Sequence, residues 1–120
     1  MKGDDSAERL VALAVRVVTI VDALPESLAG RHVAGQLVRF GTSPGANYEE
    51  ARGAKSRRDF VHQLGIALKE LQETRCWLRV VTGANRVSGA AVHAILPEVD
   101  AVCRLLGTSK RTASANRVTS

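Results

Sequence analysis

The chain has 120 residues, of which 45% are hydrophobic but only 3% aromatic, and its formal net charge is +5. This length suits one domain with a substantial core, and the ordinary apolar content excludes a disordered or collagen-like chain. Because aromatic residues are scarce, Leu, Val, Ile and Ala must fill the interior, which favours helix-on-helix packing.

The positive charge is unevenly distributed. Residues 108–120 carry Lys110, Arg111 and Arg117 and no acidic residue, so they contribute +3. The other 107 residues hold 14 Lys and Arg against 12 Asp and Glu. The high pI by itself is therefore a weak argument for nucleic-acid binding.

Several classes of protein are not expected. Cys76 and Cys103 are isolated, without a CxxC motif, which argues against a disulfide framework or a zinc site and favours a reducing cytoplasmic setting. The first residues, MKGDDSAER, are too polar for a signal peptide. No uncharged apolar run approaches the roughly 18 residues of a membrane span, so we expect no membrane association.

The first predicted helix starts at Ser6, a good N-cap, after a frayed segment 1–5, and ends before Pro25. One apolar stripe at helical spacing consists of Leu10, Leu13, Val17, Ile20 and Leu24. A second, adjacent stripe consists of Val11, Ala14, Val18 and Val21. So wide an apolar face predicts burial on more than one side, by neighbouring helices or by another subunit.

The second predicted helix covers residues 26–51 and ends at Gly53. Its proposed inward positions are Leu28, Val33, Leu37 and Phe40. Glycine and proline disfavour a helix interior, so Gly41, Pro44 and Gly45 predict a kink or a short break over 41–45. The pattern leaves open one kinked helix or two collinear pieces, and small residues also allow two backbones to approach closely.

The third predicted helix is capped by Ser56, with Asp59 in a capping-box position, and ends at Gly83 and Asn85. Its seam follows a heptad-type spacing typical of a bundle helix: Phe60, Leu64, Ala67, Leu71, Thr74, Leu78 and Val81.

The fourth predicted helix starts at Ser88, bends or restarts at Pro97 and stops at Gly107. Its apolar residues are Val92, Ile95, Val99, Val102, Leu105 and Leu106. Four helices without strand alternation predict an all-α, antiparallel up-down four-helix bundle over residues 1–107, followed by a flexible basic tail, 108–120.

The charged turn between helices two and three is the main candidate for nucleic-acid binding, with Arg52, Lys55, Arg57 and Arg58 within seven residues. Such a cluster can neutralise phosphates. The alternative is a solvated surface, because acidic residues flank the cluster and the interleaved aromatic residues of single-strand platforms are absent.

A second candidate cluster is Arg39, Asn47 and Glu50, which share parts of a helical face. They either bind a polar ligand or have a structural role, in which they satisfy backbone groups freed by the Gly/Pro segment or pair across the junction of helices two and three.

The sequence offers no catalytic constellation. Asp59 and His62 have the i,i+3 spacing of carboxylate-bundle metal sites, but no second pair exists, so no metal is expected. Cys76 has no identifiable base, and Trp77 beside it is best interpreted as a packing or interface anchor. We therefore expect no enzyme and no cofactor.

Residues 36–81 resemble the small four-helix-bundle family named after the protein encoded in 23S rRNA intervening sequences. The matching residues are Gln36, Arg39, Gly41-Thr42-Ser43, Gly45-Ala46-Asn47-Tyr48, Glu50-Ala51, Ser56, Asp59-Phe60, Leu64-Gly65-Ile66-Ala67, Lys69-Glu70, Glu73-Thr74 and Trp77-Leu78. The chain departs from the pattern at Pro44, where a β-branched residue is usual, and at Cys76, where Tyr often precedes the Trp.

The resemblance implies an antiparallel bundle that commonly assembles into a homopentameric ring, with no catalytic residues to carry over. A related group, the accessory proteins of diversity-generating retroelements, uses a similar basic pentamer to bind nucleic acid and a reverse transcriptase. The resulting hypothesis is a homo-oligomer that presents a basic rim to RNA, DNA or a nucleic-acid enzyme. The alternative is a protein-binding scaffold without nucleic-acid binding.

Overall fold

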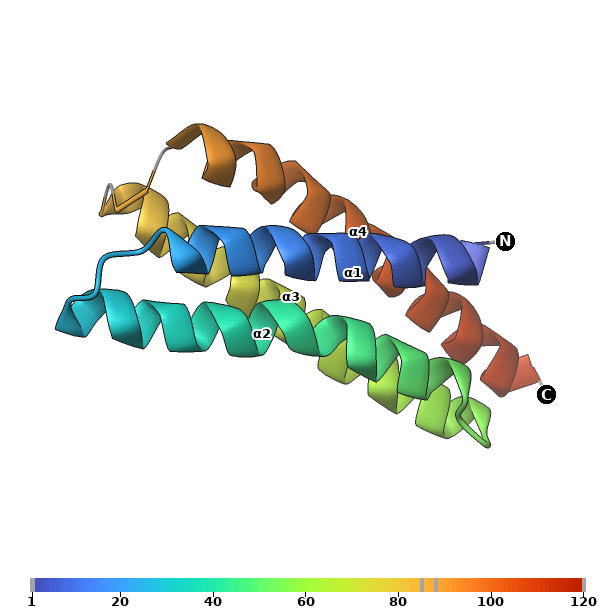
Figure 1. The fold of residues 1–120 in the computed structure, drawn as a ribbon. Helices are drawn as coiled ribbons and strands as arrows, with labels where there is room; N and C mark the ends of the chain where they lie inside the picture. Colours follow the sequence, from blue (N-terminus) through green and yellow to red (C-terminus); the bar gives the residue numbers. More distant parts are fainter. Residues whose placement is uncertain (1, 85, 88, 120) are drawn as a thin grey trace.

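The computed structural model describes residues 2–84, 86–87 and 89–119, and within these the side chains from Asp5 to Ala115. Four helices run antiparallel in sequence order: α1 (Lys2–Asp22), α2 (Leu28–Arg52), α3 (Arg57–Gly83) and α4 (Gly89–Thr119) (Figure 1). The bundle measures 52 × 23 × 20 Å. The predicted all-α four-helix bundle is confirmed. None of the described helices is both long and apolar enough to cross a membrane.

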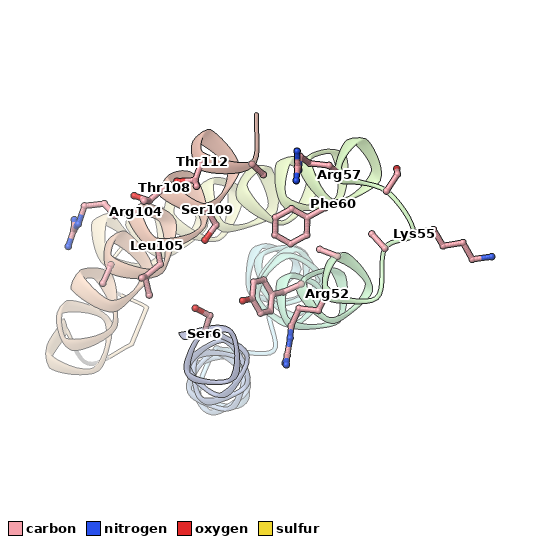
Figure 2. A pocket seen from close by; sticks show the side chains of 16 residues that line it. Ser6, Arg52, Lys55, Arg57, Phe60, Arg104, Leu105, Thr108, Ser109 and Thr112 are labelled. Atoms are coloured by element: carbon pink, nitrogen blue, oxygen red, sulfur yellow. The ribbon is translucent and has the colours of Figure 1, made fainter. Parts of the chain in front are cut away.

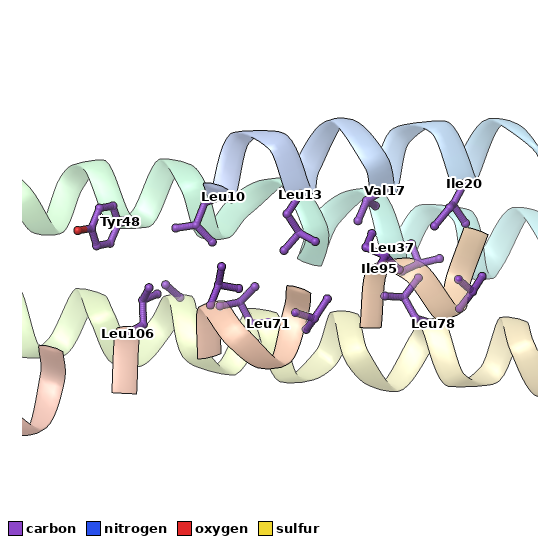
Figure 3. Packing of buried hydrophobic residues seen from close by; sticks show 14 of the residues in the cluster. Leu10, Leu13, Val17, Ile20, Leu37, Tyr48, Leu71, Leu78, Ile95 and Leu106 are labelled. Atoms are coloured by element: carbon purple, nitrogen blue, oxygen red, sulfur yellow. The ribbon is translucent and has the colours of Figure 1, made fainter. Parts of the chain in front are cut away.

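The core runs along the bundle axis and is made mainly of Leu, Val and Ile from all four helices (Figure 3). Every residue of the first predicted stripe of α1 is buried, and so is the α3 seam except for half-buried Phe60. The prediction that Leu28 points into the core is wrong, since it is 81% exposed at the start of α2. The core spacing in this helix begins only one turn later.

Helix α2 is one continuous helix through Pro44, so of the two alternatives that the sequence left open, the two collinear pieces separated by a break at 41–45 are wrong and a single helix is found. Two hydroxyls just before the proline bond to carbonyls of the preceding turn: Thr42 Oγ1 to Val38 O at 2.6 Å, and Ser43 Oγ to Arg39 O at 2.7 Å. Pro44 itself is buried. Packing of this segment compensates for its poor helix propensity.

Gly41 of α2 faces α1 at close range. A Cβ added there would lie 2.7 Å from Cγ1 and 3.0 Å from Cβ of Val17. The small residues therefore permit the close approach of α1 and α2, as the sequence suggested.

Serine side chains cap the N-termini of α2 and α3. Ser27 Oγ accepts from the Gly30 N–H at 3.0 Å, so α2 starts at Leu28 rather than at Glu26. Ser56 caps α3 as predicted, accepting from the Asp59 N–H at 3.1 Å, and Gly53 follows the end of α2. Helix α1 begins at Lys2, before the predicted cap Ser6. The predicted markers Asn85 and Ser88 lie outside the described residues.

Helix α4 continues through both Pro97 and Gly107 to Thr119, so the prediction that it stops at Gly107 is wrong. A glycine costs a helix about 1 kcal/mol, which a few tertiary contacts can outweigh. Such contacts exist. Ala113 is buried, and Lys110 packs against Gly65 of α3, because its Nζ would lie 3.2 Å from a Cβ added at that glycine. Residues 108–115, expected as a tail, therefore form part of the bundle.

A two-pronged ion pair joins α1 to α4. Arg9 Nη2 lies 2.8 Å from Glu98 Oε1, and Arg9 Nε lies 2.9 Å from Glu98 Oε2. The hydrogen bonds from Arg9 lower the pKa of the Glu98 carboxyl below its ordinary value of 4.5, against the opposing effect of partial burial. The pair therefore stabilises the folded state when Glu98 is ionised.

Replacing this carboxylate should have a pH-dependent effect. Because the folded-state pKa of Glu98 is depressed, its contribution is fully present above pH 4.5 and is lost as the pH falls through the folded-state value. For a half-exposed pair we expect Glu98→Gln to reduce the unfolding free energy by about 0.5–1 kcal/mol at pH 7. Urea unfolding at pH 7 and pH 3 checks this: the difference between variant and wild type should shrink at pH 3, and an equal difference at both values contradicts the account.

Candidate nucleic-acid interface

The four predicted cations lie together at one end of the bundle, and we call them the basic turn: Arg52, Lys55, Arg57 and Arg58. Arg52 ends α2, Lys55 lies in the connection, and Arg57 and Arg58 open α3 after the Ser56 cap. All four are exposed. Arg52 Nη1 pairs with Glu49 Oε1 at 3.1 Å, which offsets part of the local positive charge. Both chain ends lie at this same end of the molecule (Figure 1).

A cleft of about 940 Å³ lies beside the basic turn, and we call it the end cleft. Arg52, Lys55 and Arg57 contribute to its lining, and so do the aromatic residues Tyr48 and Phe60. Figure 2 shows the Phe60 ring directed into this space from the first turn of α3. The sequence argument that the turn lacks aromatic partners is thus corrected: in space, two of the chain's four aromatic residues lie next to the cations.

The opposite wall of the end cleft comes from α4. Leu105, Thr108, Ser109 and Thr112 lie on it at i, i+3, i+4 and i+7, the spacing of one helical face. Sequence reasoning missed Thr108, Ser109 and Thr112 because it ended the helix at Gly107, and it named Leu105 only as an apolar helix residue. The same spacing would have revealed them once the helix was extended.

The lining has a distinct chemistry. It combines four cationic residues, apolar surface and several hydroxyls, and none of its described lining residues carries a carboxylate or a carboxamide: Ser6, Tyr48, Ala51, Arg52, Ala54, Lys55, Ser56, Arg57, Phe60, Ala101, Arg104, Leu105, Thr108, Ser109, Thr112 and Ala113. The side chains of Lys55 and Arg104 extend outward from the rim (Figure 2). Such a site suits an anion attached to a flat or apolar group.

The second candidate cluster is not assembled into one site. Asn47 Nδ2 donates to Glu70 Oε1 at 2.7 Å, so Asn47 pairs across the junction of α2 and α3. The Arg39 guanidinium lies 4.9 Å from the centroid of the neighbouring Phe40 ring. Glu50 is exposed, and no contact within the described part of the chain joins these three residues. The structural alternative therefore accounts for Asn47.

Trp77 lies on α3 far from the end cleft. Its ring meets His32 of α2 edge-on, with centroids 5.6 Å apart and an interplanar angle of 74°. Its Nε1 is buried without a hydrogen-bond partner among the described residues. Its predicted role as an interface anchor stays a prediction. Of the two cysteines, Cys76 is exposed, while burial raises the pKa of the Cys103 thiol.

An exposed apolar face lies on the other side of the bundle axis from α3. Val11, Val15 and Val18 follow one another at i, i+4 and i+7 on α1 and are 59%, 60% and 41% exposed. Val38 of α2 is 39% exposed and lies one turn before Gly41, the residue that contacts α1. We call these four residues the valine face. Val11 and Val18 of the second predicted stripe are thus left uncovered by the chain's own helices, whereas Ala14 and Val21 of that stripe are half-buried.

A family model described as 23S rRNA-intervening sequence protein matches residues 5–108. The chain belongs to this family. No curated protein matches it. A crystal structure of a protein of unknown function from the S23 ribosomal protein family of Bacteroides thetaiotaomicron VPI-5482 is 32% identical. The match covers 92% of this chain and 99% of that one, with a TM-score of 0.85.

The 23S rRNA-intervening sequence protein match includes the whole basic turn but ends at Thr108. Ser109, Thr112 and Ala113, which complete the α4 wall of the end cleft, lie beyond it. The cations therefore belong to the family part of the chain, whereas part of the cleft wall lies in its last helical turns.

Proposed function

We propose that this chain is a cytoplasmic, non-enzymatic and oligomeric member of the 23S rRNA-intervening sequence protein family that binds RNA or DNA through its basic turn. The observation that carries the proposal is the position of four exposed cations on one end of the bundle, beside a cleft whose described lining residues include no carboxylate. Lys and Arg side chains neutralise phosphates and release condensed counterions, which is the main sequence-independent source of affinity.

Self-association would multiply this charge. The valine face gives a second copy an apolar surface to cover, and exposed contiguous apolar patches mark interaction sites. The family resemblance implies a pentamer. Five copies in a ring would align their basic turns in a rim of about 20 positive charges.

Neutralising two residues of the basic turn tests the proposal. We expect Arg57→Ala/Arg58→Ala to weaken binding of a labelled RNA or DNA oligonucleotide at least about tenfold, since each lost phosphate contact also removes counterion release. Fluorescence anisotropy at fixed low salt measures this. The matched control is Arg79→Ala/Arg86→Ala, which removes the same charge from exposed residues near the other end of α3.

Equal losses in both double variants would show that net charge alone, and not this turn, determines binding. No binding by the wild-type protein would leave the second candidate, a protein-binding scaffold, which the exposed valine face favours. In that case the basic turn is only a solvated surface.

A further inference from the structure

We propose that the end cleft accepts one unstacked base of a single-stranded nucleic acid while the adjoining phosphates lie on the basic turn. This inference rests on the proposed function and specifies its ligand: single strands rather than duplex. A base inside a duplex is stacked on both faces and cannot enter a cleft, whereas a single strand can turn a base outward.

The first argument is the position of Phe60. Its side chain is half-buried and its ring projects from α3 into the cleft, with Leu105 on the facing wall (Figure 2). An aromatic face next to cations is the arrangement on which proteins stack bases without sequence preference. Arg57 lies one turn before Phe60, on the same side of α3, so a phosphate at Arg57 and a base at Phe60 can belong to one strand.

The second argument is the polar lining. Ser6, Ser109 and Thr112 offer hydroxyls, which both donate and accept and can serve any base edge. Asn, Gln, Asp and Glu, whose fixed donor and acceptor patterns read particular bases, do not occur among the lining residues whose side chains the structure describes, from Asp5 to Ala115. The cleft therefore predicts base binding with little preference between bases.

The size of the cleft agrees with this ligand. Its volume of about 940 Å³ lies within the range of about 300–1,000 Å³ typical of small-molecule sites, so it has room for a base and its sugar. Its lining also joins segments that lie far apart in the chain, from Ser6 on α1 to Thr112 on α4. Extension of α4 past Gly107 is what closes this wall.

The test compares the chain's two phenylalanines. Phe60→Leu keeps apolar volume but removes the stacking ring, and Phe40→Leu makes the same change at a half-buried residue of α2 outside the cleft. Stacking of one base is worth about 1–3 kcal/mol by alanine substitution, so we expect Phe60→Leu to weaken binding of single-stranded oligo(dT) and oligo(dA) about 5- to 150-fold. Binding of a duplex of equal length should change less than about twofold, and Phe40→Leu should change neither.

A second variant guards against a folding defect in the first. Thr112 is exposed on the rim of the cleft, so Thr112→Trp fills the cleft without removing a core side chain. It should likewise weaken single-strand binding selectively, with helix content and unfolding midpoint close to wild type. If the Phe60→Leu protein does not fold, the binding measurements on Thr112→Trp test the inference.

Two results would overturn the inference. The first is that Thr112→Trp and folded Phe60→Leu bind single strands as tightly as the wild-type protein does, while Arg57→Ala/Arg58→Ala still loses binding. In that case the proposed function stands, but the cleft does not bind a base. The other is an equal loss for single strands and duplex. If no variant and no wild-type protein binds nucleic acid, the proposed function and this inference fail together.

Discussion

Val15→Glu should convert the proposed oligomer into folded monomers and weaken nucleic-acid binding about 100-fold or more. Val15 is 60% exposed in the single chain and lies in the middle of the α1 part of the valine face. In an assembly that covers this face, a glutamate would be desolvated without a partner, which costs several kcal/mol per site. Loss of the ring would then remove multivalent engagement, which can raise affinity by about 10²–10⁴.

The control is Val80→Glu. Val80 of α3 is 43% exposed and lies on the helix side opposite the core seam, so the substitution adds the same charge on another face. Sedimentation velocity at fixed protomer concentration measures assembly, and the oligonucleotide assay measures binding. If the oligomer persists in Val15→Glu but dissociates in Val80→Glu, the subunit interface does not include the valine face.

Gly41→Leu should destabilise the fold by about 3 kcal/mol, a large share of the 5–15 kcal/mol by which domains of this kind are stable. Even a Cβ at this position would lie 2.7 Å from a methyl of Val17. Val17 is fully buried and β-branched, so its side chain has few alternative rotamers into which it can move. The leucine must therefore push α1 and α2 apart along their closest contact. Urea unfolding measured at one protomer concentration gives the difference.

Gly35→Leu is the matched control in the same helix. Nothing lies within 4 Å of a Cβ added at Gly35, so the same side chain meets open space there. Leucine also has a better helix propensity than glycine, by up to about 1 kcal/mol. We expect Gly35→Leu to leave stability unchanged or slightly higher. Similar losses for both variants would show that propensity or aggregation, and not the α1–α2 contact, determines the effect.

The bundle itself was predictable from periodicity. The α3 seam follows four-and-three spacing without interruption, and each member from Leu64 to Val81 is buried. The side-chain oxygens of Ser27 and Ser56 cap the helices that follow, an arrangement that depends on local sequence alone. The N-cap role of Ser56 was predicted correctly. The start of α2 was instead predicted at Glu26, one residue before the actual cap Ser27.

Where predicted helix breaks do not occur, tertiary contacts outweighed local propensity. Pro44 and Gly107 predict breaks when each is considered alone, but both segments are held by packing that lies far away in the sequence. Leu28 has the composition of a core residue but precedes the first buried turn of α2. Hydrophobic character does not by itself place a side chain in the core.

Of the candidate site, the basic turn could be predicted from the sequence, whereas the end cleft could not, because the cleft depends on tertiary contacts. The basic turn is contiguous in sequence, so its four cations were found at once. The end cleft joins residues from all four helices, and no pattern within one segment reveals that Tyr48, Phe60 and Thr112 line a common space. Its discovery required the path of α4 beyond Gly107.

Titration of a labelled single-stranded RNA or DNA with the oligomer over a series of salt concentrations tests the central claim most directly. If the basic turn binds phosphates, the logarithm of the binding constant should fall linearly with the logarithm of salt, with a slope of about −0.7 per phosphate neutralised. Arg57→Ala/Arg58→Ala should make that slope shallower by about 0.7 for each arginine removed. Absence of binding at low salt, or binding that does not respond to salt, would contradict the account.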